Sequence, residues 1–179
     1  MRVFIAIDLP EEVRKKLTES EKEIGILNQR AKLKIVKPEN LHITVRFLGH
    51  ISDDKVNKVK EALKKVKFEP FKVKLNNFGV FPSLKFIRVV WIDVLPKEQL
   101  IELENKIDKV LGDVGFKRTK NFETHITLAR VKYLADKQGF IDGLKKITVD
   151  PIEFEIKNFS LKKSTLTREG PVYEDILVI

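Results

Sequence analysis

A four-residue pattern that occurs twice constrains the fold more than any other feature of this sequence. Residues 42–45 are His-Ile-Thr-Val and residues 125–128 are His-Ile-Thr-Leu. In a β-strand, residues i and i+2 point to the same face, so each segment would present His and Thr on one face and two apolar side chains on the other. The pattern therefore predicts two half-buried strands whose His-Thr faces can line a common groove.

The rest of the chain reads as alternating strands and helices. Pro10 and Pro96 are expected to open helices, Ser52 is a plausible N-cap, and a hairpin is expected around residues 82–85. The predicted strands are 3–9, 33–36, 41–48, 71–81, 86–94, 124–131, 152–161 and 172–179, and the predicted helices are 10–25, about 53–66, the segment from Pro96 to about Gly112 or Gly115, and 136–145.

This order predicts an α+β fold in which residues 1–179 form a single bilobal domain. No Gly/Ser linker or low-complexity run divides the chain, and 42% hydrophobic residues are enough to build a core that the two halves share. We expect the faces opposite the catalytic side chains to pack on helices of their own lobes. The residues expected to be buried for this reason are Phe4, Ile7, Ile43, Val45, Ile126 and Leu128.

Charge and cysteine content exclude some functions and leave others open. Lys and Arg number 35 against 26 Asp and Glu, a net charge of +9 that suits a partner carrying phosphates. The same richness in charge is also typical of the solvated surface of a thermophilic protein. The absence of cysteine excludes disulfides, zinc thiolate sites and thiol nucleophiles. The apolar stretch at the N-terminus is too short for a signal peptide or membrane span, and we expect a cytoplasmic protein.

The residue types in the repeated pattern favour proton transfer over other chemistry. A lone histidine is more often an ordinary packed imidazole, but two in the same context favour a functional pair. The pattern lacks the second imidazole or carboxylate that a metal site needs within one element, so no metal or cofactor is expected. No serine turn typical of nucleophilic hydrolases is present. His42 and His125 can thus act as general acid and base, while Thr44 and Thr127 donate hydrogen bonds to a phosphate.

Other candidates near the two patterns are weaker. Arg46, four residues after His42 and expected on the same strand face, and Arg130 after the second pattern could clamp a phosphate, or could be surface charge. Three aromatic residues could stack on a base, although core packing is the favoured interpretation: Phe47, Trp91 and Tyr133. His50 lacks a threonine partner and is interpreted as a loop or structural residue.

Together these segments resemble a known family, the RNA 2′,3′-cyclic phosphodiesterases or 2′-5′ RNA ligases of the two-histidine phosphoesterase superfamily. The resemblance rests on RVFIAIDLP, LHITVRFLG, VFP followed by FIRVVWIDV, THITLARV and the closing SLKKSTLTREGPVYEDI. It implies two pseudo-symmetric lobes, each with an antiparallel sheet packed by helices, and a groove lined by both motifs. It also implies that His42 is the proton donor, His125 the proton acceptor, and Thr44 and Thr127 phosphate binders.

The sequence thus predicts an enzyme that opens a 2′,3′-cyclic phosphate at an RNA end to a 2′-phosphomonoester. The partner would be RNA, for example tRNA fragments, with a nucleotide as a further ligand, and the protein would be a monomer without membrane contact. With an RNA hydroxyl in place of water, the same acid and base pair would join RNA ends through a 2′-5′ linkage. Two alternatives stay open: a non-catalytic RNA- or nucleotide-binding module, and a cyclic phosphodiesterase for small nucleotides.

Overall fold

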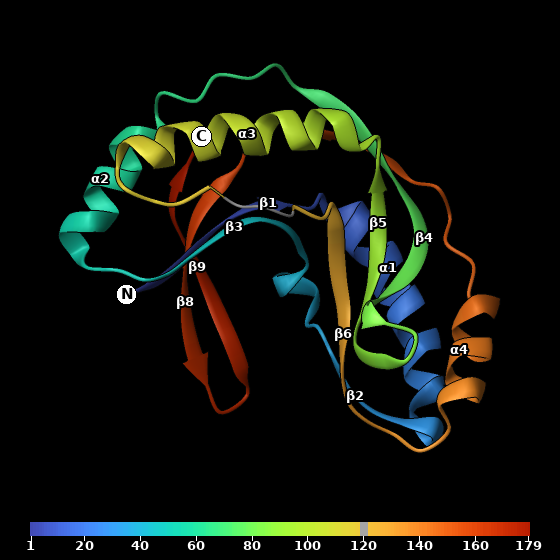
Figure 1. Ribbon diagram of the computed structural model, residues 1–179. Coiled ribbons are helices and arrows are strands. Elements are labelled where there is room, and N and C mark those ends of the chain that lie inside the picture. Colours follow the sequence, from blue (N-terminus) through green and yellow to red (C-terminus); the bar gives the residue numbers. More distant parts are fainter. Residues whose placement is uncertain (119–121) are drawn as a thin grey trace.

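The computed structural model describes residues 1–118 and 122–179, and its described part is an α+β fold of nine strands and four α-helices (Figure 1). In chain order the elements are β1 (Arg2–Asp8), α1 (Glu11–Ile26), η1 (Leu27–Arg30), β2 (Ala31–Ile35), η2 (Pro38–Asn40), β3 (His42–His50), α2 (Asp53–Leu63), β4 (Phe71–Ser83), β5 (Phe86–Leu95), α3 (Lys97–Asp113), β6 (His125–Leu134), α4 (Lys137–Lys146), β7 (Glu153–Ile156), β8 (Ser160–Thr167) and β9 (Gly170–Val178).

The nine strands form one curled antiparallel sheet in which the two motif strands are neighbours. The strand order is β7-β4-β5-β6-β3-β1-β8-β9, and β2 pairs with β6 beside this path. β3 and β6 meet through a single residue pair, Ile43 with Ile126. Because these are the apolar residues that follow the two histidines, the junction between the two lobes brings both His-Thr faces to the same place.

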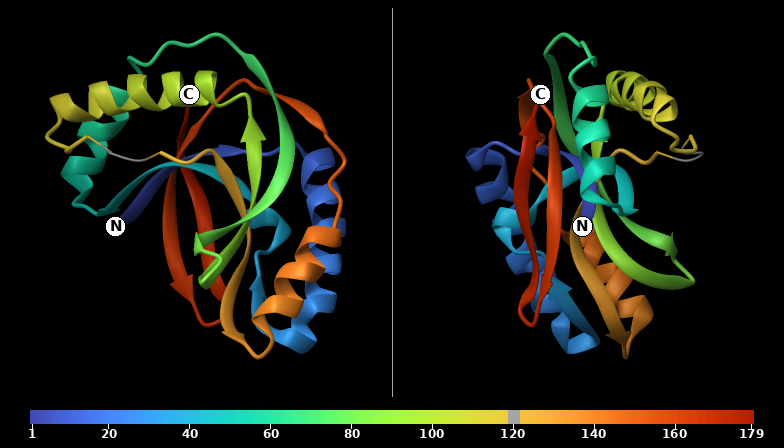
Figure 2. Two further views of the ribbon diagram at one scale, coloured as in Figure 1. Left: turned by 45° about the vertical axis from the view of Figure 1, so that its right-hand side comes forward. Right: turned by 90° about the vertical axis from the view of Figure 1, so that its left-hand side faces the viewer.

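The helices lie in two groups at opposite ends of the molecule. α2 packs against α3 at one end, and α1 contacts β2 and β6 at the other, where α4 packs against η1. Figures 1 and 2 show that β1 and β3 pass beneath α3, while the β8–β9 hairpin and the β2–β6 pair extend away from it. In the sheet, β3 and β1 lie between β6 and this hairpin.

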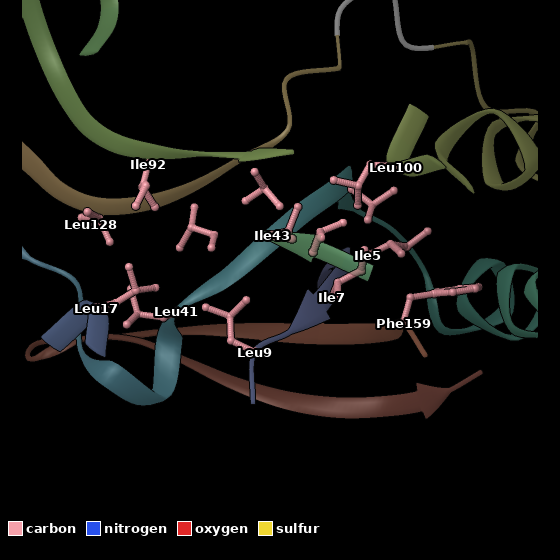
Figure 3. Packing of buried hydrophobic residues seen from close by; sticks show 14 of the residues in the cluster. Ile5, Ile7, Leu9, Leu17, Leu41, Ile43, Ile92, Leu100, Leu128 and Phe159 are labelled. Carbon is pink, nitrogen blue, oxygen red and sulfur yellow. The ribbon is translucent and has the colours of Figure 1, made fainter. Parts of the chain in front are cut away.

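One core of buried apolar side chains runs through both groups, as Figure 3 shows around Ile43. α1 supplies Leu17 and α3 supplies Leu100, and both are 1% exposed or less. The six side chains predicted to be buried are buried, since none exceeds 4% exposure: Phe4, Ile7, Ile43, Val45, Ile126 and Leu128. For Phe4 the predicted reason is wrong, because this ring lies on the groove side, against His42. Each motif strand is therefore anchored from behind by apolar packing.

Some predicted boundaries are confirmed and others are wrong. Ser52 caps α2, where its hydroxyl accepts a hydrogen bond from the Lys55 backbone N–H. The single strand predicted over 152–161 is wrong, because β7 pairs with β4 and β8 with β1, far apart in the sheet. Buried residues there are spaced by three from Ile156 to Phe159, which breaks strand periodicity. His50 is not in a loop but ends β3, opposite Arg2.

Within the described residues, no helix is long and apolar enough to span a membrane.

Candidate active site

A groove of about 840 Å³ lies between the two motif strands and the β8–β9 hairpin. Its walls include all four residues of the repeated pattern: His42, Thr44, His125 and Thr127. The structure therefore brings together the residues that the sequence predicted would face each other from strands far apart in the chain.

His42 is held in a defined orientation by the backbone before it. Its Nδ1 lies 2.7 Å from the carbonyl oxygen of Asn40, and its Nε2 lies 2.8 Å from Oγ1 of Thr44. Since a carbonyl can only accept, Nδ1 carries the proton and donates, which leaves Nε2 as the nitrogen for chemistry. Asn40 is itself buried and its side chain donates to the carbonyl of Pro171 at 3.0 Å. The start of β9 thus helps to orient the histidine.

His125 is oriented in the same way. Its Nδ1 lies 2.9 Å from the carbonyl oxygen of Glu123, two residues upstream as for His42. Each imidazole also packs against two aromatic rings. His42 lies beside Phe4 and Tyr173, with ring centroids 5.2 and 5.4 Å away, and His125 beside Phe81 and Trp91, at 4.9 and 5.9 Å. The two halves of the site are therefore pseudo-symmetric in their contacts.

Burial lowers the pKa of both imidazoles. It lowers the pKa of His42 from its ordinary value of 6.5 to about 4, and the Asn40 carbonyl and the charge of Asp8 oppose this only in part. Burial also lowers the pKa of His125, again opposed by a carbonyl, here that of Glu123. Both rings are thus neutral at pH 7, and each can accept a proton at Nε2.

A bulge in each motif strand decides which later residues face the groove. Thr44 pairs with Ala6 and Arg46 with Ile5, so Val45 is an extra residue in β3. Likewise Thr127 pairs with Trp91 and Ala129 with Val90, so Leu128 is extra in β6. After each bulge the alternation of faces is inverted. The groove residue is therefore the fifth after each histidine: Phe47 in β3 and Arg130 in β6.

The bulge in β3 changes two predictions. Arg46 does not share a strand face with His42 as expected, and its guanidinium forms a 2.9 Å ion pair with Asp108 of α3 and donates to the Lys117 carbonyl. Its side chain is only 11% exposed and, although it contributes to the groove wall, its charge is paired. The core-packing prediction for Phe47 is wrong, since this side chain is 66% exposed beside Phe4.

The other three candidate residues, Arg130, Trp91 and Tyr133, lie in different environments. Arg130 is exposed on the groove wall, and no ion pair or hydrogen bond holds its side chain within the described residues. Trp91 is half-buried and does not belong to the apolar core; it stacks on Phe81 with ring centroids 4.8 Å apart and lies beside His125, so the core-packing interpretation is wrong for it. Tyr133 does not pack in the core and is 63% exposed. No group of three potential metal-ligating side chains occurs in the part of the chain that the structure describes.

A family model described as LigT like Phosphoesterase matches residues 7–91 and again residues 92–173. Each match contains one His-Thr motif. The chain belongs to the LigT-like phosphoesterase family.

Relatives within the LigT-like family agree over the full length of the chain. A protein of Methanocaldococcus jannaschii named RNA 2′,3′-cyclic phosphodiesterase is 37% identical over 177 residues, which cover 98% of each chain. The crystal structure of TT0787 of Thermus thermophilus has a TM-score of 0.83 and 27% identity, and covers 99% of this chain and 96% of that one. The structure of E. coli LigT complexed with 3′-AMP has a TM-score of 0.77 and 25% identity, with 99% and 96% covered.

Sequence reasoning missed a charged cluster behind the motif of the first LigT-like half. Lys162 of β8, largely buried, forms ion pairs with Asp8 at 2.8 Å and with Asp175 at 2.6 Å. Asp8 is the β1 partner of His42 in the sheet. The sequence offered one indication of this cluster, because Asp8 is an acidic residue at the end of an otherwise apolar strand. Lys162 and Asp175 come from β8 and β9, and no local sequence pattern connects them to Asp8.

Proposed function

We propose that this protein hydrolyses the terminal 2′,3′-cyclic phosphate of RNA to a 2′-phosphomonoester, with His42 as proton donor and His125 as proton acceptor. One observation carries the proposal. Both histidines donate from Nδ1 to the carbonyl two residues upstream, and both line one groove together with the motif threonines. The M. jannaschii relative, which is named for this activity, supports the choice of reaction and of RNA as substrate.

The proposed step is an in-line displacement at phosphorus. His125 accepts a proton at Nε2 from water as the water oxygen bonds to phosphorus, and the bond from phosphorus to the 3′-oxygen breaks. Protonated His42 gives its Nε2 proton to the leaving 3′-oxygen. Thr44 and Thr127 donate to the phosphate oxygens that carry the developing charge. With an RNA 5′-hydroxyl in place of water, the same step would form a bond from the 5′-oxygen to phosphorus, break the bond to the 3′-oxygen and leave a 2′-5′ linkage.

His42 must be protonated to act as the donor, although burial lowers its pKa to about 4. The negative charge of a bound cyclic phosphate favours the imidazolium form, and Asp8 acts in the same direction. Substrate binding therefore supplies the missing stabilisation of the charged ring. The donor is charged when the substrate is present and neutral when it is absent.

Charge and relatives support a nucleotide-containing substrate in this groove. Its basic wall residues are Arg2, Lys34, Lys37, Arg46 and Arg130, against the acidic Glu123 and Glu169. E. coli LigT has been crystallised with 3′-AMP, which makes a single nucleotide a reasonable second ligand here. The proposal includes RNA fragments such as those of tRNA, a monomeric protein, the 179 residues acting as one bilobal unit, and the cytoplasm as the compartment of the RNA.

An end-group assay tests the reaction. The protein is incubated with an oligonucleotide that ends in a 2′,3′-cyclic phosphate, in the presence of excess EDTA, and the new end is identified by its sensitivity to phosphatase and by chromatography against 2′- and 3′-phosphate standards. A 2′-phosphate formed at an undiminished rate supports the proposal. A 3′-phosphate product would mean that the 2′-oxygen leaves and not the 3′-oxygen. Loss of activity with EDTA would mean that the reaction requires a metal ion, which contradicts the two-histidine mechanism.

The same assay separates the non-catalytic alternative. If the cyclic end persists while the RNA binds, the protein is a binding module. If adenosine 2′,3′-cyclic phosphate is hydrolysed but the oligonucleotide is not, the protein is a cyclic phosphodiesterase for small nucleotides.

A further inference from the structure

Basic and aromatic side chains continue beyond the groove along the β2–β6 pair. Four of these residues form what we call the outer arm: Lys34 and Arg130, which also line the groove, and Lys32 and Tyr133. Figures 1 and 2 show β2 and β6 extending together away from α3.

The pairing of the two strands places all four side chains on one face. Lys34 is the partner of Arg130, and Lys32 is the partner of Tyr133. Partners across a strand pair point to the same face, and residues two apart in β2 do so as well. The register shift after Lys32 leaves Lys132 as an extra residue in β6, so Arg130 and Tyr133 share a face despite odd spacing. Since Arg130 lines the groove, the outer arm continues the groove face.

The charge of the outer arm is not neutralised locally. Neither β2 nor β6 contains an acidic residue. Lys32, Lys34 and Arg130 are exposed, and none of them takes part in an ion pair within residues 1–118 and 122–179. Lysines on an edge strand can serve simply to prevent pairing with another chain. That role does not require an aromatic ring between them, and Tyr133 is 63% exposed.

We propose that the single-stranded RNA leading to the terminal phosphate lies along the outer arm, where a base stacks on Tyr133 and phosphates contact Lys32 and Lys34. This inference rests on the proposed function for the position of the RNA end. Stacking on exposed aromatic rings combined with lysine contacts to the backbone is how proteins bind single strands without reading their sequence. Tyr133 is eight residues from His125, roughly 20–26 Å along a strand with two bulges, which is farther than a mononucleotide held at the histidines extends.

The test compares a short and a long substrate with the same reactive end. We measure kcat/KM of wild type, Tyr133→Ala and Lys32→Gln for adenosine 2′,3′-cyclic phosphate and for an eight-nucleotide RNA ending in the same group. Both variants are expected to match wild type on the mononucleotide. On the RNA, Tyr133→Ala should lose about 5- to 150-fold, the range known for one stacked base. Lys32→Gln should reduce kcat/KM on the RNA by a smaller factor. The decrease of kcat/KM with salt concentration should also become less steep, by the amount expected for about one phosphate contact.

Two controls isolate stacking and charge. Tyr133→Phe keeps the ring and should retain activity on the long RNA. Lys22→Gln removes an exposed lysine from α1, which lies outside the groove lining, and should leave both substrates unaffected. If Tyr133→Ala and Lys32→Gln lose no more on the long RNA than on the mononucleotide, the inference is wrong and the lysines serve as edge protection.

A binding measurement keeps this inference separate from the proposed reaction. Fluorescence anisotropy with a labelled RNA that ends in a 2′-phosphate needs no turnover. If wild type hydrolyses neither substrate, the proposed function fails, but weaker RNA binding by Tyr133→Ala would still support the outer arm. Equal binding by wild type and both variants would overturn it.

Discussion

The Nε2 atom of His42 lies 2.8 Å from Oγ1 of Thr44. Because Nδ1 of the same ring donates to the Asn40 carbonyl, Nε2 is an acceptor and the threonine hydroxyl is the donor. The hydroxyl that is proposed to bind phosphate is therefore aimed at the histidine. Once His42 is protonated, its Nε2 no longer accepts, and the hydroxyl would be released for the phosphate. Under the proposed function, Thr44 would thus couple the protonation of His42 to phosphate binding.

Removal of the Thr44 hydroxyl should raise the pKa of His42. The hydrogen bond from Thr44 favours the neutral ring, so its loss in Thr44→Val makes protonation easier, while turnover falls by about 10- to 150-fold because a bond to the phosphate is also lost. An NMR titration of the imidazole nitrogens measures the first effect. Thr127→Val is the control and should leave the pKa of His42 unchanged. A His42 pKa that falls or does not move in Thr44→Val would contradict this coupling.

The pH dependence of turnover should differ between free enzyme and complex. Burial lowers the pKa of both histidines, so kcat/KM should decline as pH rises across neutrality, because protonated His42 becomes scarce in the free enzyme. In the complex the phosphate charge raises these pKa values, so the descending limb of kcat should lie at higher pH. Full rate profiles from pH 4 to 9 on a short substrate check this. Coincident limbs for kcat and kcat/KM would show that the phosphate does not stabilise the imidazolium.

Each histidine should be needed for turnover and neither for the fold. His42→Ala and His125→Ala should each reduce kcat by about 10²-fold or more, and the double variant should lose little beyond the worse single variant, because both groups act in one step. RNA affinity, measured by anisotropy, should stay near wild type. His50→Ala, at the exposed end of β3, is the matched control and should retain full activity. If the double variant instead lost kcat by the product of the two single-variant factors, the two histidines would act in separate steps.

The two arginines after the motifs should give opposite results. Arg46 is paired with the buried Asp108, so Arg46→Met should destabilise the protein by about 3–5 kcal/mol, as expected when one partner of a buried ion pair is lost. Arg130 is exposed and faces the groove, so Arg130→Met should leave the free energy of unfolding within about 0.5 kcal/mol and reduce kcat/KM instead. Urea unfolding and steady-state kinetics on both variants decide this. Loss of activity at full stability in Arg46→Met would restore Arg46 as a phosphate ligand.

The sequence predicted the motif strands and the four central side chains because strand alternation is a local property. The predictions for Arg46 and Phe47, directly after the first motif, were wrong. A bulge inserts one extra residue into the strand, so every later side chain points to the opposite face from the one that simple alternation predicts. No particular residue type marks a bulge in the sequence. The split of residues 152–161 into β7 and β8 escaped for a related reason. Both pieces are extended and carry apolar residues among polar ones, and they differ chiefly in their partner strands, which lie at distant places in the sheet.

A buried acid outside the site should set how stability changes with pH. Glu21 of α1 is 3% exposed, and its Oε1 has no hydrogen-bond partner among the described atoms. Burial raises the pKa of this carboxyl from 4.5 to about 8. The folded protein therefore binds this proton between pH 4.5 and 8 while the unfolded chain has lost it. The free energy of unfolding should thus fall as pH rises through this window, by at most about 1.4 kcal/mol per pH unit.

Glu21→Gln should remove this dependence, because the amide keeps the shape of the neutral acid and does not titrate. His42 acts in the opposite sense, since its lowered pKa costs stability as pH falls from 6.5 toward 4, and this effect persists in the variant. Urea unfolding at pH 5, 6, 7 and 8 gives the slope of the free energy of unfolding against pH for wild type and for Glu21→Gln. Glu23→Gln, on the exposed side of α1, is the matched control. The variant should gain stability relative to wild type as pH rises, most at pH 8. Parallel curves for the two proteins would mean that Glu21 is already ionised in the fold at neutral pH, which would require a compensating partner for its charge.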